Sequence, residues 1–150
     1  MKKGFTLIEL LVVIGVMVLV AGIALFSIRN VREASLDNKR EADLRLIQSS
    51  FARYNADCYT YPSSLPTAGS ALTGDQSLAP SCESTNTYVN NFPADPDPSR
   101  NYYYNVTEVV AGKNVSYILC AALTTDNDPS SDVSGCGSCG SLACNIKFTN

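Results

Sequence analysis

The first 28 residues restrict the possible folds more than any other segment of the 150-residue chain. A short leader, residues 1–4, contains Lys2 and Lys3, and the run over residues 5–28 has Glu9 as its one charged side chain. As an α-helix this run is about 36 Å long, whereas the hydrocarbon core of a bilayer is about 30 Å thick. The sequence therefore predicts a membrane-spanning helix, with the lysines in the cytoplasm and the rest of the chain across the membrane.

Glu9 distinguishes this run from a cleaved secretory signal and from a plain membrane anchor. A carboxylate in an apolar helix costs about 2.5–3.5 kcal/mol at the bilayer centre, and such residues usually have a specific partner. A secretory signal also has a shorter apolar region, about 7–15 residues before its small-residue cleavage site. Here the small residues at 21–24 are followed by further apolar positions. Both alternatives are therefore disfavoured.

The residues around Gly4 resemble a known processing signal. The sequence KKGFTLIE at residues 2–9 is similar to the class III signal of type IV pilins and type II secretion pseudopilins. The resemblance implies cleavage by a prepilin peptidase between Gly4 and Phe5, and N-methylation of Phe5. It also implies that Glu9 acts in assembly, opposite the terminal amine of a neighbouring subunit.

The resemblance also implies partners and a location. The partners are identical or related pilins, a prepilin peptidase, an inner-membrane assembly platform, a cytoplasmic assembly ATPase, and membrane lipid before assembly. The expected location is the bacterial inner membrane as a single-pass precursor, and then an extracellular or periplasmic filament.

The charges of the processed chain support the pairing of Glu9 with an amine independently of the resemblance. A free α-amine has a pKa of about 8, so Phe5 would begin the processed chain with a positive charge, one helical turn before Glu9. In a filament core without water each charge is costly alone and tolerated when paired. We therefore expect a staggered arrangement in which amine meets acid and the apolar surfaces supply the attraction.

The helical pattern continues beyond the apolar run. Apolar side chains recur at three- and four-residue steps at Leu44, Ile47, Phe51 and Tyr54, which predicts one buried helical face. The absence of proline before residue 62 allows a single helix over about residues 5–55, about 75 Å long. Most charged residues between positions 29 and 45 are interpreted as a solvated face. The predicted division is a leader at 1–4, a membrane or filament-core helix at 5–28, an amphipathic continuation at 29–56 and an extracytoplasmic head at 57–150.

One position departs from the pilin pattern. Many pilins have a proline at mature position 22, associated with a kink or a melted stretch in the filament, and that position is Phe26 here. Gly15 and Gly22 are the helix-weakening residues of the run, each costing about 1 kcal/mol relative to alanine. A melted stretch would therefore depend on these two glycines.

The composition from residue 57 onward predicts turns and short strands. Strands are expected at 102–109, 115–122 and 145–148, with a turn at Gly112-Lys113 or Lys113-Asn114. The expected fold class is α+β, with the C-terminal half of the helix packed on a small antiparallel sheet of three or four strands. Tyr61-Pro62 and the PADP sequence at 93–96 resemble the helix exit and the turn before the sheet in pseudopilins.

Three consecutive tyrosines begin the first of these strands, at residues 102–104. Alternate residues of a strand point to opposite faces, so at least one ring is expected to point outward. Half-buried strand aromatics are favoured here over a role in adhesion or electron transfer.

Six cysteines follow the membrane segment, and an even number in an exported domain predicts up to three disulfides. Cys58 with Cys82 would close a loop, and the other four would join the C-terminal stretch to the strand at 115–122, although sequence alone does not choose the connectivity. The C-x-x-C spacing at 136–139 also occurs in zinc and redox sites, but its glycine-rich surroundings favour disulfides. The six are Cys58, Cys82, Cys120, Cys136, Cys139 and Cys144.

Three carboxylates within seven positions form a candidate calcium loop, at Asp126, Asp128 and Asp132. The segment lacks an EF-hand pattern, so a solvated turn is the competing interpretation. No other cofactor is expected.

The charge balance excludes several functional classes. The whole chain has a formal net charge of −3, and residues 57–150 contain 3 basic and 9 acidic residues. Direct nucleic-acid binding is not expected, because it needs clustered lysine and arginine. The chain has no histidine, nucleophile motif or phosphate loop, so we expect no enzyme.

The sequence therefore predicts a structural subunit of a type IV pilus or pilus-like filament. A pseudopilin of a type II secretion or DNA-uptake system is an alternative within the same class. A membrane-anchored adhesive or binding domain with a pilin-like leader is an alternative from a different class. About 90 extracytoplasmic residues suffice for one small domain.

Overall fold

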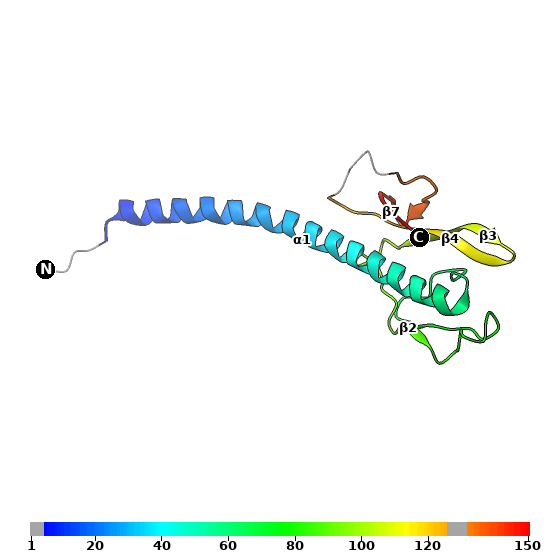
Figure 1. Ribbon diagram of the computed structural model, residues 1–150. Coiled ribbons are helices and arrows are strands. Elements are labelled where there is room, and N and C mark those ends of the chain that lie inside the picture. Colours follow the sequence, from blue (N-terminus) through cyan, green and yellow to red (C-terminus); the bar gives the residue numbers. More distant parts are fainter. Residues whose placement is uncertain (1–4, 126–131) are drawn as a thin grey trace. The chain divides into compact units, whose positions relative to one another are not determined.

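The structure of the protein is a computed structural model that describes residues 5–125 and 132–150, with the backbone alone for residues 24–30 (Figure 1). It is α+β, as predicted, and divides after Ser35 into two compact units. The elements in chain order are α1 (Leu7–Cys58), β1 (Leu72–Thr73), β2 (Thr87–Val89), β3 (Tyr103–Val110), β4 (Lys113–Ala121), β5 (Ser138–Cys139), β6 (Leu142–Ala143) and β7 (Ile146–Thr149).

The first unit consists of the beginning of α1 and exposes its apolar side chains. All large apolar side chains between Leu7 and Ile23 are exposed, and Gly15 and Gly22 do not interrupt the helix. Within the described residues, no helical stretch is both long enough and apolar enough for a membrane crossing.

The second unit, residues 36–150, contains the hydrophobic core. Leu44, Ile47, Phe51 and Tyr54 on α1 are buried, which confirms the predicted helical face. The ring of Phe51 packs edge to face against Tyr104 and Tyr117, at centroid distances of 5.4 and 5.5 Å. α1 ends at Cys58, three residues beyond the predicted end, and Tyr59 then adopts a left-handed conformation with φ 56°.

The main sheet is an antiparallel meander in the order β3-β4-β7. Its strands lie within two residues of the predicted ones. The predicted turn was wrong: Val110 pairs with Lys113, so the two turn residues are Ala111 and Gly112, with φ values of 50° and 78°. Such a turn needs positive φ at both central positions, and here glycine occupies the second of them rather than the first.

The three adjacent tyrosines lie at different depths. Tyr102 is buried, whereas Tyr103 and Tyr104 are half-buried and pack on different clusters of the core. The half-buried aromatic interpretation is confirmed for the latter two. Two further antiparallel pairs, β1 with β2 and β5 with β6, were not predicted.

Candidate assembly site and the contacts that support the head

Thr6 and Glu9 form a reciprocal hydrogen-bonded pair at the start of α1. The Thr6 backbone N–H and hydroxyl donate to Glu9 Oε2 at 2.9 and 2.7 Å, and the Glu9 backbone N–H donates to Thr6 Oγ1 at 3.4 Å. This is a capping box, in which the first and fourth residues satisfy free helix N–H groups. The T-x-x-E spacing before an apolar run is the sequence signal for this motif, although the capping box was not predicted.

The predicted processing site lies partly within the described residues. Gly4 lies outside them, and Phe5 has 81% of its surface exposed. Glu9 is exposed and lies in the first turn of α1, within the same short segment. The structure thus places Phe5, Thr6 and Glu9 together at one end of α1.

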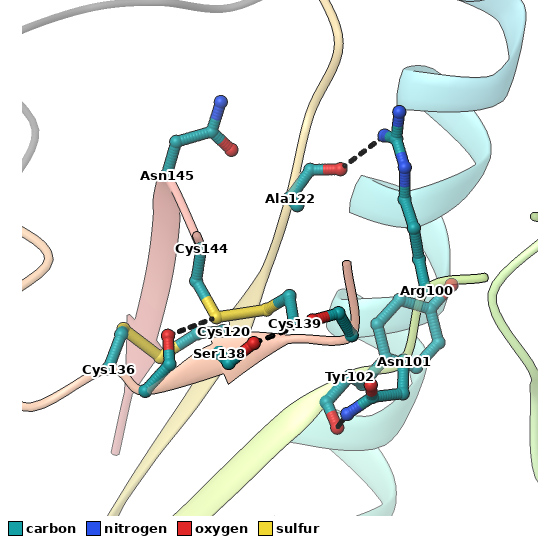
Figure 2. The surroundings of a disulfide bond; sticks show 12 residues. Arg100, Asn101, Tyr102, Cys120, Ala122, Cys136, Ser138, Cys139, Cys144 and Asn145 are labelled. Atoms are coloured by element: carbon teal, nitrogen blue, oxygen red, sulfur yellow. Dashed lines mark hydrogen bonds between the residues drawn. A yellow bond between two sulfur atoms is a disulfide. The ribbon is translucent and has the colours of Figure 1, made fainter. Parts of the chain in front are cut away.

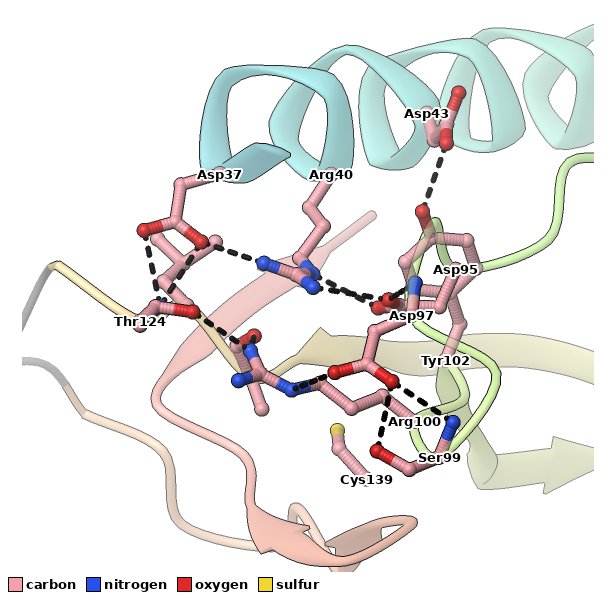
Figure 3. A network of polar contacts seen from close by, with 12 residues as sticks. Asp37, Arg40, Asp43, Asp95, Asp97, Ser99, Arg100, Tyr102, Thr124 and Cys139 are labelled. Carbon is pink, nitrogen blue, oxygen red and sulfur yellow. Dashed lines mark hydrogen bonds and ion pairs between the residues drawn. The ribbon is translucent and has the colours of Figure 1, made fainter. Parts of the chain in front are cut away.

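A buried ionic network joins α1 to the loop before β3 (Figure 3). The Arg40 side chain is 1% exposed and donates to Asp37 at 2.7 Å and to both oxygens of Asp95 at 2.9 and 3.0 Å. Asp95 also accepts the backbone N–H of Asp97 at 2.8 Å. Buried charges are stable only when paired and hydrogen-bonded, and the Arg40 guanidinium here donates only to carboxylates.

Asp37 joins the same network to the chain that follows β4. Its carboxylate accepts the backbone N–H groups of Thr124 and Thr125 at 2.7–2.9 Å and the Thr125 hydroxyl at 2.6 Å. Burial raises the pKa of Asp37, but the hydrogen bonds from Thr125, Thr124 and Arg40 outweigh burial and lower the pKa below its usual range. The carboxylate is therefore held in its charged form.

Arg100 and Tyr102 extend these polar contacts. The Arg100 guanidinium donates to the Ala122 carbonyl at 3.0 Å and to the Thr124 hydroxyl at 2.9 Å. The Tyr102 hydroxyl donates to Asp43 on α1 at 2.8 Å, and burial together with this bond raises the pKa of Tyr102 well above its usual value (Figure 3). α1 is thus bonded to the segment before β3 at two places and to the chain that follows β4.

The charged part of α1 therefore divides into two groups. Lys39 and Arg53 are exposed, in agreement with a solvated face, whereas Asp37 and Arg40 are buried. The burial of these two residues was not predicted. Asp37 and Arg40 are three residues apart, which is an ordinary spacing for a helical pair, whereas the other partner of Arg40, Asp95, lies 55 residues away and gave no signal in the helical spacing.

Three disulfides join all six cysteines. Cys58 bonds to Cys82 as predicted, and Cys120 bonds to Cys136, which joins β4 to the C-terminal stretch. Cys139 bonds to Cys144 across the β5–β6 hairpin, so the expectation that these two cysteines also join the C-terminal stretch to the strand at 115–122 was wrong. The last two bonds lie side by side in the second cluster of the core (Figure 2).

The C-x-x-C cysteines are therefore not partners of each other. Cys136 bonds to β4, whereas Cys139 bonds to Cys144. Since both sulfurs are in disulfides, neither is a free thiolate, and the zinc and thioredoxin-like interpretations are not supported.

The candidate calcium residues are only partly described. Asp126 and Asp128 lie outside the described residues. Asp132 is exposed and pairs with Lys147 at 2.9 Å; this cation and the hydrogen bonds from Ser134 hold the pKa of Asp132 well below its usual range. No metal-binding group of three or more ligands occurs among the described residues. Calcium binding stays a prediction.

Comparison with known proteins gives one match, at the N-terminus. Residues 1–25 match the family model described as the prokaryotic N-terminal methylation motif. No curated protein and no solved structure matched the chain. The matched segment includes Gly4, Phe5, Thr6 and Glu9. The chain therefore begins with a prokaryotic N-terminal methylation motif, the class III signal of type IV pilins and pseudopilins.

Proposed function

We propose that this protein is a structural subunit of a type IV pilus or pilus-like filament. In this proposal it enters the inner membrane as a precursor, loses residues 1–4 to a prepilin peptidase and becomes methylated at Phe5. It then joins the filament through α1. The methylation motif at residues 1–25 is the observation that carries the proposal.

The exposure of the first unit supports a role in assembly. Phe5 and the apolar side chains from Leu7 to Ile23 have no partner in the described part of the chain. Burying one such side chain contributes about 1.5–3 kcal/mol, so a helix of this kind is stable only in lipid or against other apolar helices. The proposal supplies both environments in turn, lipid before assembly and neighbouring subunits afterwards.

The contacts of Glu9 suggest how the change of environment is accommodated. In the single chain its carboxylate caps the helix through Thr6. Cleavage after Gly4 would create an amine next to Thr6, and the carboxylate of a neighbouring copy would then meet this amine as α1 leaves the lipid. Glu9 would thus have two partners, Thr6 within its own chain and the amine of the next subunit.

Two substitutions separate the charge of Glu9 from its capping role. Glu9→Gln keeps an acceptor suited to a capping box but removes the charge, whereas Glu9→Ala removes both. We expect both variants to be inserted and processed and neither to build filaments, as measured by leader loss in the membrane fraction and by the yield of sheared fibres. If Glu9→Ala builds fibres at the wild-type yield, the assembly role of Glu9 is wrong. If only Glu9→Gln builds them, Glu9 acts as a cap rather than as a charge.

The same motif is compatible with a pseudopilin of a secretion or DNA-uptake system. A membrane-anchored adhesive domain is the alternative from another class, and it would remain in the membrane fraction without any fibre. Electron microscopy of the sheared material therefore distinguishes a filament subunit from an anchored domain.

A further inference from the structure

The second unit exposes one long face of α1 that the head does not cover. This outer face lies opposite Leu44, Ile47 and Phe51, which point into the core. Leu46 on the outer face is 43% exposed. We define the outer face by its exposed residues, Lys39, Ala42, Arg45, Leu46, Ser49, Arg53 and Ala56.

The centre of the outer face is lined by small side chains. Ala42, Ser49 and Ala56 recur every seven residues, which places them in one row along the helix. A hollow of about 410 Å³ lies beside this row, between Ser49 and Ala52 of α1 and the ring of Tyr61. Another chain can therefore approach α1 closely along this row.

The outer face is basic. Lys39 and Arg53 form no ion pair among the described residues, and Arg45 has 68% of its side chain exposed, with Glu41 at 3.4 Å. Two of the three basic residues of the head are used internally, because Arg100 pairs with Asp97 and Lys147 pairs with Asp132. The basic charge available to a partner is thus concentrated on α1.

The head has an exposed acidic loop, which we define as residues 75–83. Asp75 and Glu83 are exposed, and neither forms an ion pair in the part of the chain that the structure describes. The loop is held together because the Asp75 backbone N–H donates to Cys82 Sγ at 3.1 Å and Gly74 packs directly on the Glu83 carbonyl. The Cys58–Cys82 disulfide fixes the loop at the C-terminal end of α1.

We propose that the outer face of α1 binds the acidic loop of a second copy of this chain. The two surfaces have opposite charge and differ from each other, and Lys39, Arg53, Asp75 and Glu83 form no ion pair among the described residues. Contact between two different surfaces of identical chains generates a ring or an open helical array rather than a two-fold dimer, and a displacement along the axis gives the open array. This inference rests on the proposed filament function and names the surfaces through which neighbouring heads meet.

The positions of the two surfaces also predict a displacement. The acidic loop is fixed at Cys58, whereas the basic residues lie between Lys39 and Arg53. The midpoint of the basic residues is Leu46, so their separation from Cys58 along α1 is about 12 residues, or about 18 Å. Copies whose helices run in the same direction must therefore be displaced along the axis by about this distance.

Photocrosslinking in the full-length protein tests the contact. A benzophenone amino acid at Ser49, in assembled filaments, is expected to crosslink to a peptide containing residues 75–83 of another copy, as identified by mass spectrometry. The matched control carries the same group at Asn105 on β3, which is exposed and away from the outer face, and is expected not to label that peptide.

Charge reversal tests the electrostatic part of the proposal. Arg53→Glu with Lys39→Glu should lower the Ser49 crosslink about tenfold or more, because like charges then oppose each other. Adding Asp75→Lys and Glu83→Lys should restore it. Lys113→Glu changes the net charge outside the outer face and should leave the crosslink unchanged.

The outcomes separate this inference from the proposed function. If filaments form and Ser49 labels the apolar helix, another part of the head, lipid or nothing, the contact is wrong and the filament function stands. If crosslinking to residues 75–83 is unaffected by charge reversal, the complementarity is wrong. If the wild-type chain forms no filament, the proposed function itself fails.

Discussion

The two units of this protein differ in whether their apolar side chains are exposed or buried. Between Leu7 and Ile23 every large apolar side chain is exposed, whereas in residues 36–150 the core is closed and the charged residues Asp37 and Arg40 are buried with partners. The first unit depends on its surroundings for burial, and the second supplies burial from its own chain. Residues 36–150 therefore form a core from their own side chains, whereas the apolar side chains of the first unit are buried only by lipid or by other chains.

Removing the apolar part of the first unit, residues 1–28, should have the largest effect. A fragment of residues 29–150 should be soluble without detergent and unfold in one cooperative transition, because its core and all three disulfides are retained. The full chain should require detergent, because its apolar helix is exposed. Sedimentation and denaturant unfolding measure both properties. A fragment that aggregates or lacks a cooperative transition would show that the head is not self-sufficient.

Breaking the ionic network should have the next largest effect. Arg40→Ala would leave the buried carboxylates of Asp37 and Asp95 without their shared cation, so the free energy of unfolding of the fragment should fall by about 3–5 kcal/mol. Arg53→Ala, at an exposed position of the same helix, is the control and should change it by less than about 0.5 kcal/mol. Equal effects of the two substitutions would contradict the assigned role of the network.

The contribution of each disulfide to the free energy of unfolding should depend on the length of the loop that it closes. The chain-entropy model predicts a loss of about 3.5 kcal/mol when Cys58 and Cys82, separated by 24 residues, are both replaced by serine. The same replacement of Cys139 and Cys144, separated by 5 residues, should cost about 2 kcal/mol. Denaturant titrations of the two variants give the order. The reverse order would indicate that local packing, rather than loop closure, dominates.

Alkaline pH should weaken the head gradually. Burial raises the pKa of Tyr102 and Tyr104 above the usual value, and raises the pKa of Tyr117 to about 12. Above pH 10 the unfolded chain loses these protons first, so the stability present below pH 10 should be lost as the pH rises through the folded-state pKa values. Tyrosinate absorbance measures the ionisation of the tyrosines, and denaturant unfolding at each pH measures the loss of stability. Stability that stays constant between pH 10 and pH 12 would contradict the burial of these rings.

Patterns within short segments of the sequence correctly predicted elements that depend mainly on interactions between nearby residues. Helical spacing identified Leu44, Ile47 and Phe51 as core residues, and strand composition placed β3, β4 and β7 within two residues. The Cys58–Cys82 bond was found because it closes the loop that directly follows α1.

The features that sequence reasoning missed depend on tertiary contacts. Arg40 meets Asp95 only because the loop before β3 folds back onto α1. The pairs β1–β2 and β5–β6 involve strands of two or three residues, which are too short for a periodic pattern. The Thr6–Glu9 capping box is the exception, since its spacing was visible and was not used.

The central claim is that processing at Gly4 converts the exposed first unit into the assembling part of a filament. The most direct test is to shear filaments from cells, image them and determine the mass and N-terminal residue of this protein in the same sample. The account predicts visible fibres that contain a chain beginning at N-methylated Phe5. Fibres without this protein, or a chain that retains residues 1–4 and remains in the membrane fraction, would contradict it.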